Sequence, residues 1–114
     1  MTTNQGSSDV AIVGAGVIGL AVAWQAARRG LRVTLLERGE PGRGTTHAAA
    51  GMIAPIAEAS PAEPALLELG MASARAYPSF VQALSESSGV DPLYRRFGTV
   101  LVARDADEAQ ALVY

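Results

Sequence analysis

The sequence predicts an α/β fold built on a Rossmann-like βαβ unit, followed by the beginning of a second, α+β domain. Two short apolar runs rich in β-branched residues, 9–13 and 31–36, flank an alanine-rich stretch. A glycine-rich turn, Gly14-Ala-Gly-Val-Ile-Gly19, joins the first run to that stretch. Two parallel strands with a crossover helix between them need about this length of chain.

Composition narrows the classes of protein that remain. The 114 residues are 49% hydrophobic and 18% charged, which is not the composition of a disordered chain. The absence of cysteine and the single histidine exclude disulfides, thiolate chemistry and a multi-histidine metal cage. A net charge of -2 argues against nucleic acid or an anionic membrane as the partner. We expect no metal site.

Targeting signals are not expected. Residues 10–27 carry no charge, but three glycines and a β-branched start favour a strand, a turn and a helix over a membrane span. Residues 1–8 lack the basic side chain of a secretory signal. We therefore expect a cytoplasmic protein with a flexible tail at 1–8.

The βαβ unit is predicted element by element. The run 9–13 is expected to form a strand buried on both faces, as in parallel sheets. A helix is expected over Leu20–Arg29, with Gly30 in the position of a C-terminal cap. A second strand is predicted over 31–36, and Glu37 stands at its carboxyl end.

The remaining residues predict a loop, helices and further strands. Residues 38–55 hold four glycines and two prolines, so they read as a structured loop in which 45–50 opens a short helix. Apolar residues near a 3.6-residue period predict a helix over 61–88, which Pro78 kinks or divides. The last expected elements are a turn at 89–92, one or two strands over 93–103 with a bulge or bend at Gly98, and a helix that opens at Asp105 with acids in its first turn.

The spacing Gly14-x-Gly16-x-x-Gly19 gains its meaning from the strand before it and the helix after it. Gly14 permits the tight turn, Gly16 lets a pyrophosphate approach the backbone, and Gly19 allows close packing of helix on sheet. The residues between them are Ala15, Val17 and Ile18. Free N–H groups near the last two would face the phosphates. The alternative is an ordinary glycine-rich turn.

Glu37 follows Gly14 by 23 residues, at the end of the second predicted strand. A carboxylate there can accept hydrogen bonds from both ribose hydroxyls of an adenosine. It also disfavours a 2′-phosphate, so NADP is not the expected ligand. The glycine turn and Glu37 do not by themselves distinguish NAD from FAD as the ligand. The alternative for Glu37 is a surface glutamate with no role in binding.

The segment after Glu37 favours FAD. An NAD-type fold continues with alternating helices and strands, whereas this chain continues with GRGTTHAAAGMIAP. Thr45 and Thr46 offer hydroxyls at a second phosphate-facing helix start. The small residues of 48–51 would let backbone lie against a flat flavin ring. The alternative is an alanine-rich loop packed on the core.

These residues carry a resemblance. The run DVAIVGAGVIGLAVAWQAARRG, followed by VTLLERG and GRGTTHAAAGMIAPIAEA, resembles the FAD-dependent amine oxidases of the D-amino-acid oxidase type. It is most similar to the thiamine-pathway glycine oxidases, whose loop reads much like TT-x-AAAGM. The later LYRRFGTVLVARDADEA is similar to the start of that family's substrate domain. The resemblance implies the N-terminal part of an FAD-binding domain over 9–88 and a truncated substrate domain over 89–114.

The resemblance also implies ligand contacts. The backbone of Val17 and Ile18 would contact the FAD diphosphate, and Glu37 and Arg38 would hold the adenosine end. The remaining contacts would come from the loop: Thr45 and Thr46 on the phosphates or ribityl chain, and Ala50, Gly51 and Met52 beside the isoalloxazine. Met52 could equally be an ordinary core methionine.

The reaction implied is oxidation of glycine or a related amino acid or secondary amine by oxygen, giving an imino or oxo acid and hydrogen peroxide, in thiamine biosynthesis. No catalytic residue is expected in this stretch, which we expect to be inactive by itself, and the full-length enzyme could form a homo-oligomer. The alternatives are a non-catalytic FAD-binding fragment, an FAD-dependent sarcosine or dimethylglycine dehydrogenase, and an NAD-dependent dehydrogenase.

Two other sets of residues could have a chemical role, as a carboxylate clamp or a covalent flavin link, but a simpler interpretation of each is preferred. Arg95, Arg96 and Arg104 could clamp a carboxylate, but they read better as a solvated strand face. His47 lies four residues before Gly51. Related dehydrogenases carry a flavin-linked histidine three residues before the glycine, so His47 reads as a polar loop residue near the phosphates.

Overall fold

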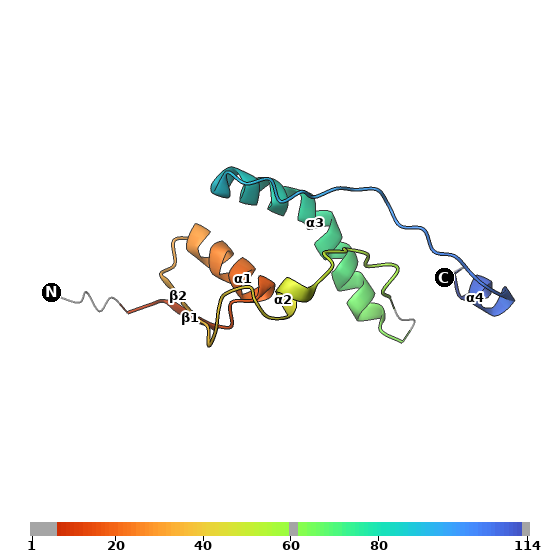
Figure 1. Ribbon diagram of the computed structural model, residues 1–114, viewed down its shortest axis with the longest axis horizontal. Helices are drawn as coiled ribbons and strands as arrows, with labels where there is room; N and C mark the ends of the chain where they lie inside the picture. The colour runs from red at the N-terminus through yellow and green to blue at the C-terminus, as the bar shows by residue number, and fades with distance from the viewer. Residues whose placement is uncertain (1–6, 60–61, 113–114) are drawn as a thin grey trace. The chain divides into compact units, whose positions relative to one another are not determined.

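The computed structural model describes residues 7–59 and 62–112. The order of its elements is β1 (Val10–Val13), α1 (Val17–Arg28), β2 (Val33–Leu36), α2 (Thr45–Ala48), α3 (Pro64–Ser88) and α4 (Ala106–Ala111) (Figure 1). The chain forms two compact units, Met1–Met52 and Ile53–Tyr114. The first unit holds β1 to α2, and the second holds α3 and α4. Within the described ranges, no helix has both the length and the apolar character that a bilayer crossing requires.

The first unit contains the predicted βαβ arrangement. β1 and β2 pair in parallel, in a register that runs from Val10 opposite Val33 to Val13 opposite Leu36. α1 connects the two strands and packs against both of them. The parallel pair with its crossover helix is confirmed, and it gives the unit its α/β character. Each strand is shorter than expected at its N-terminal end, by one residue in β1 and by two in β2.

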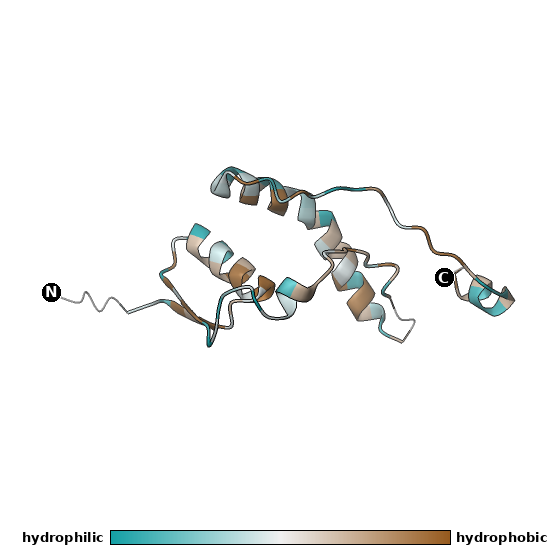
Figure 2. Ribbon diagram, viewed as in Figure 1, coloured by the Kyte–Doolittle hydropathy of each residue, from teal (hydrophilic) through white to brown (hydrophobic). Residues whose placement is uncertain are grey.

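The prediction that the strand at 9–13 is buried on both faces is wrong. Burial alternates along β1 and β2 between half-buried and exposed residues, and Val13 is 85% exposed. Figure 2 shows both strands in the hydrophobic colour. Of the described residues, only Ala15 (0% exposed) and Ala26 (8%) are buried. The reason is that, within the first unit, α1 alone makes extensive contact with this two-stranded sheet, and a parallel sheet is buried on both faces only when both are covered.

Polar contacts fasten the starts of the two strands. Arg32 pairs with Asp9, whose Oδ1 lies 2.8 Å from the guanidinium Nη2, and this hydrogen bond is the main reason that the pKa of the Asp9 carboxyl is lowered. Residues 1–6 of the predicted tail lie outside the described residues. Ser8 accepts a hydrogen bond from the Thr34 hydroxyl at 2.9 Å, so this end of the tail lies beside β2.

The end of α1 follows the sequence prediction closely. Gly30 adopts the left-handed conformation at φ +82°, directly after the last helical turn. Its N–H donates to the carbonyl of Ala27, and the N–H of Leu31 donates to that of Ala26. This pair of bonds is the Schellman motif, which satisfies the last carbonyls of a helix. The start differs from the prediction, because the helix begins at Val17 rather than Leu20.

In the second unit, the expected helix over 61–88 is present as α3, a continuous helix of 25 residues over Pro64–Ser88. Pro61 lies outside the described residues. Pro78 sits inside α3 without dividing it. Figure 1 shows that the helix changes direction part-way along its length. A proline ring removes one helical N–H and crowds the carbonyl four residues earlier, here that of Ala74, so a kink is the expected response.

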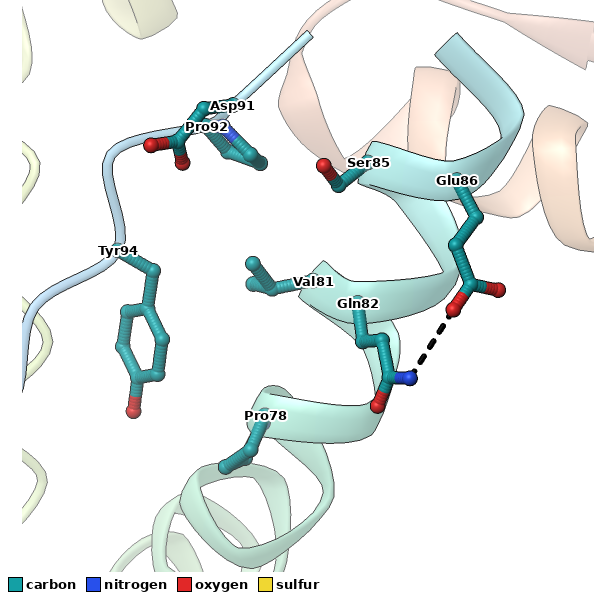
Figure 3. A pocket seen from close by; sticks show the side chains of 8 residues that line it. All are labelled: Pro78, Val81, Gln82, Ser85, Glu86, Asp91, Pro92 and Tyr94. Carbon is teal, nitrogen blue, oxygen red and sulfur yellow. Dashed lines mark hydrogen bonds between the residues drawn. The ribbon is translucent and has the colours of Figure 1, made fainter. Parts of the chain in front are cut away.

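After α3 the chain turns back along the helix. Gly89 ends α3 in the left-handed conformation, and its N–H donates to the carbonyl of Ser85 at 2.8 Å. The ring of Tyr94 then packs edge-on against Tyr77, with centroids 5.1 Å apart. The turn predicted at 89–92 is therefore the start of a return segment. An open hollow of about 310 Å³ lies between this segment and the second half of α3, and Figure 3 shows the side chains that line it.

The strands predicted over 93–103 are absent, and this prediction is wrong. No residue of that range pairs with another described strand. Most of its large apolar side chains are exposed: Leu93, Val100, Leu101, Val102 and Phe97, the last by 91%. The β-branched pattern is present, but a strand also needs a neighbour for its backbone hydrogen bonds. The residues that follow form the expected helix, α4. Asp105 caps it by accepting the N–H of Glu108 at 2.8 Å, with acids in the first turn.

The bend in α3 gives a testable consequence. A proline inside a helix costs roughly 3 kcal/mol, which its stiffening of the unfolded chain offsets by only about 0.4–1 kcal/mol. Pro78→Ala is therefore expected to stabilise the helix by about 2 kcal/mol. Chemical denaturation followed by circular dichroism measures the change. Ser79→Ala is the matched control at an exposed neighbouring position. Equal midpoints for the two variants would contradict this account of the bend.

Candidate functional site

The glycine turn after β1 is the centre of the candidate site. Gly14 takes φ +97°, a conformation that residues with a Cβ rarely adopt, and its N–H donates to the carbonyl of Leu36 at 2.7 Å. The turn therefore lies directly beside the end of β2. Ala15, the second residue of the turn, is fully buried. Gly16 follows in extended conformation as the N-cap residue of α1.

Gly19 sets how closely α1 approaches the turn. A Cβ at this position would lie 1.9 Å from the carbonyl oxygen of Gly14, a distance that no real contact reaches. The missing side chain lets the first turn of the helix lie directly on the backbone of the glycine turn. The close approach expected at Gly19 is thus made chiefly to the glycine turn. The same added Cβ would lie 3.6 Å from Ile12 Cγ2 of β1, an ordinary contact distance.

The first amides of α1 differ in what they bind. The N–H of Val17 donates to the Thr46 hydroxyl oxygen at 2.9 Å, so this amide is not free in the structure. Within the described ranges, no carbonyl or side chain accepts a hydrogen bond from the amides of Ile18 and Gly19. The first turn holds no acidic side chain. The positive end of the helix dipole is therefore available to an anion chiefly through the amides of Ile18 and Gly19.

Glu37 lies where the spacing placed it, directly after β2. One carboxylate oxygen accepts the N–H of Ala15 at 2.8 Å, and the other accepts the N–H of Gly39 at 3.0 Å. Hydrogen bonds from the amides of Ala15 and then Gly39 hold the pKa of this carboxyl below its ordinary value, with a smaller contribution from the neighbouring Arg38. The side chain is thus an anion that ties the end of β2 to the glycine turn.

The loop that follows Glu37 and contains α2, called the second loop below, also reaches the glycine turn. The predicted short helix at 45–50 is present over Thr45–Ala48. Thr46 is half-buried against the start of α1, while Thr45 is exposed. Both threonines line an open hollow of about 530 Å³ beside the glycine turn. The residues that line it are Ile12, Val13, Gly14, Gly16, Val17, Ile18, Gly19, Val22, Thr45, Thr46 and Ala49.

Other predicted site residues lie apart from this hollow. Arg38, Ala50, Gly51 and Met52 do not line it, and the Met52 side chain is 76% exposed. Gly51 takes φ +77°, so the backbone turns at this point. The structure therefore brings together the glycine turn, Glu37 and the two threonines, but not the segment expected beside a flavin ring.

Sequence reasoning missed Gly42. Its N–H donates to the carbonyl of Ala15 at 2.8 Å, and its φ of +76° requires glycine. The dipeptide Pro41-Gly42 is a standard turn signal, but nothing in it indicates the partner. Together with Glu37, this bond holds both backbone groups of the buried Ala15.

The remaining charged candidates have local partners or lie in solvent. His47 lies 3.5 Å from Arg43, between Nε2 and Nη1. Arg95 pairs with Asp91 at 3.5 Å, and the Arg104 Nε lies 3.0 Å from the Glu108 carboxylate. These arginines are solvated, as expected, but they lie on irregular backbone or beside α4 rather than on a strand. The described residues hold no group of three or more His, Cys, Asp or Glu side chains placed for a metal.

Comparison with known proteins assigns this arrangement to a family. The model of the DAO family, described as FAD dependent oxidoreductase, matches residues 9–113. The chain belongs to the DAO family of FAD-dependent oxidoreductases. The match includes the glycine turn, Glu37 and the α2 loop.

Several relatives of the chain are glycine oxidases. The chain is 38% identical over 104 residues to a glycine oxidase of Geobacillus kaustophilus, with 91% of this chain and 27% of the relative covered. It is 41% identical over 106 residues to one of Pseudomonas aeruginosa, with 93% and 29% covered. A crystal structure of glycine oxidase from Bacillus cereus matches with a TM-score of 0.78 at 34% identity and covers 94% of this chain and 29% of that one.

The chain thus spans less than a third of the length of these relatives. The structural match supports the βαβ unit with its parallel strands. It does not add the strands predicted for a second domain.

The contact at Gly19 predicts a severe effect of one methyl group. Gly19→Ala is expected to destabilise the βαβ unit by about 3 kcal/mol or more, because overpacking already costs 1–3 kcal/mol where side chains can adjust, and here the clash is with backbone. Urea denaturation measures the change. Gly39→Ala is the control, since a Cβ there meets only Glu37 Oε1, at an ordinary 3.9 Å. Similar midpoints for the two variants would refute the role given to Gly19.

The Glu37 contacts predict a pH dependence. Because folding lowers the pKa of this carboxyl, its contribution to stability is present above the unfolded value, near 4.5, and is lost as the pH falls through the lower folded value. Glu37→Gln is therefore expected to destabilise the protein at neutral pH, and the difference from wild type should shrink as the pH approaches 3.

Denaturation midpoints between pH 7 and 3 measure this difference. Glu68→Gln is the control, because no hydrogen bond joins that carboxylate to another described residue. A difference between Glu37→Gln and wild type that stays constant with pH would contradict the role of the charge.

Proposed function

We propose that the complete protein is an FAD-dependent oxidase of glycine or a related amine, and that residues 14–52 form the first part of its dinucleotide site. The observation that carries the proposal is that side chains from two later segments of the chain both bind amides of the glycine turn. Thr46 of the second loop lies 2.9 Å from the Val17 amide of the glycine turn, and Glu37 lies 2.8 Å from the Ala15 amide of the same turn.

The residues present fit a diphosphate. The amides of Ile18 and Gly19 have no acceptor among the described residues, and the first turn of α1 carries no acid that would repel an anion. A Cβ on Gly14 would meet no atom within 4 Å, so the main chain there is open to a close ligand. The hollow beside the turn gives the ligand room.

Glu37 fits the adenosine end of the same ligand. Each carboxylate oxygen accepts one backbone amide and keeps further lone pairs for a ribose hydroxyl. The group is ionised at neutral pH, and its lowered pKa extends the ionised form to more acidic solutions. A second anion, such as a 2′-phosphate, would be repelled there. The side chain thus favours FAD or NAD over NADP, and Arg38 would lie beside the adenosine.

The flavin end of the ligand would lie along Ala50, Gly51 and Met52. Small residues and the left-handed turn at Gly51 let backbone approach a flat ring. When bound, FAD would supply a hydride acceptor for the α-carbon of the amine and would pass the electrons to oxygen, giving hydrogen peroxide. The share of this chain is to bind and orient the cofactor, and we assign no catalytic residue to it.

The substrates proposed for the complete enzyme are a small amino acid or secondary amine and oxygen. The loop TTHAAAGM supports a place in thiamine biosynthesis, through its resemblance to the glycine oxidases of that pathway. We further propose a cytoplasmic location, an FAD-binding domain that includes 9–88, and a substrate domain that begins within 89–114. A homo-oligomer of the full-length protein is part of the same proposal.

The proposal predicts cofactor content and turnover. The complete product of the reading frame, purified without added cofactor, is expected to show the visible absorbance of flavin and to release FAD on denaturation. Peroxide release with glycine, sarcosine and D-alanine then identifies the substrate. Protein that contains no flavin and binds no added FAD would refute the cofactor assignment.

Other outcomes discriminate the alternatives. Bound NAD in place of FAD would indicate a nicotinamide-dependent dehydrogenase. Reduction of an artificial dye without peroxide release would indicate a dehydrogenase of the sarcosine type. Yellow colour that stays with the acid-precipitated protein would show a covalent flavin and would return attention to His47.

A further inference from the structure

Helix α1 begins without a cap of its own. Its N-cap residue is Gly16, which has no side chain, and its first turn contains no acid. The first amides of a helix have no partner within the helix, so an uncapped start leaves them to water or to a ligand. Most helices solve this with Ser, Thr, Asp or Asn at the N-cap position itself.

Thr46 supplies the missing cap from a distant part of the sequence. Its hydroxyl oxygen accepts the N–H of Val17 at 2.9 Å, although the two residues are 29 positions apart. The neighbouring Thr45 is exposed, and no hydrogen bond joins its side chain to another described residue. The two adjacent hydroxyls therefore have different surroundings.

Glycine at position 16 leaves room for this contact. A Cβ there would lie 3.2 Å from the Thr46 hydroxyl oxygen, tighter than nine in ten real contacts, so the hydroxyl would have to shift. Gly42 adds a second link between the loop and the turn, through the carbonyl of Ala15 at 2.8 Å. The second loop is thus fastened to the glycine turn on both sides of Gly16.

We propose that Thr46 is a positioning residue for diphosphate binding. By capping Val17, it holds the start of α1 in one arrangement, with the amides of Ile18 and Gly19 left unpaired for an anion. This inference rests on the proposed function. It assigns different work to the two threonines: Thr46 prepares the turn before any ligand binds, whereas the Thr45 hydroxyl is open to a ligand.

Three variants of the complete protein, freed of bound flavin, test this role: Thr46→Val, Thr46→Ser and Thr45→Val. The probes are ADP, which carries a diphosphate, and adenosine, which carries none. Thr46→Val is expected to weaken ADP binding about ten-fold, the effect of losing a strong helix cap. Adenosine binding, measured by calorimetry or competition, should change less than about two-fold. Thr46→Ser should restore ADP affinity.

Several results would overturn the proposal. They are unchanged ADP affinity in Thr46→Val, an equal loss for adenosine, and failure of Thr46→Ser to restore binding. An equal loss for adenosine would mean that the variant only weakens the fold. Hence the comparison of the two probes separates positioning from general stability.

Hydrogen exchange without ligand tests the cap independently. In wild type, the Val17 amide should be protected within the peptide 14–20, and Thr46→Val should remove that protection, whereas Thr45→Val should not. Unchanged exchange in Thr46→Val would refute the cap. If wild-type protein bound neither ADP nor FAD but Val17 showed this pattern, the proposed function would fail while the cap stood, and the diphosphate role would be rejected.

Discussion

The lack of a side chain at Gly19 sets the geometry of the whole βαβ unit. Because Gly19 has no Cβ, the first turn of α1 rests on the carbonyl of Gly14, and the helix can cross both strands at close range. That approach brings the positive end of the helix to the end of β1. The capping hydroxyl, the open amides and the nearby hollow all depend on it, since each is located relative to the start of α1.

Local patterns predicted the elements whose causes are local. Glycine at position 30 ended α1 as expected, and Asp105 capped α4, because both effects involve residues within one helical turn. Burial of β1 and the strands over 93–103 could not be read in the same way. Exposure depends on what packs against a strand, and strand formation depends on a neighbouring backbone; neither is encoded in the run of residues itself.

The candidate site shows the same division. The spacing from Gly14 to Glu37 correctly placed an acid beside the turn, because a βαβ unit has a nearly constant length. It did not reveal that the Ala15 and Val17 amides already have side-chain partners. Those partners come from the path of the loop after β2, which depends on turns such as Gly42. Family membership adds FAD as the cofactor on which the family depends, and the substrate remains part of the proposal.

The register of the two strands restricts how this stretch can vary in length. With Val13 opposite Leu36, the residue that follows each strand belongs to the candidate site: Gly14 after β1 and Glu37 after β2. An insertion of one residue within β2 would exchange its two faces and carry the carboxylate away from the turn. A change in length outside the paired segment would leave this register in place, whereas a change within it would not. Deletion scanning across residues 28–36 would map that boundary directly.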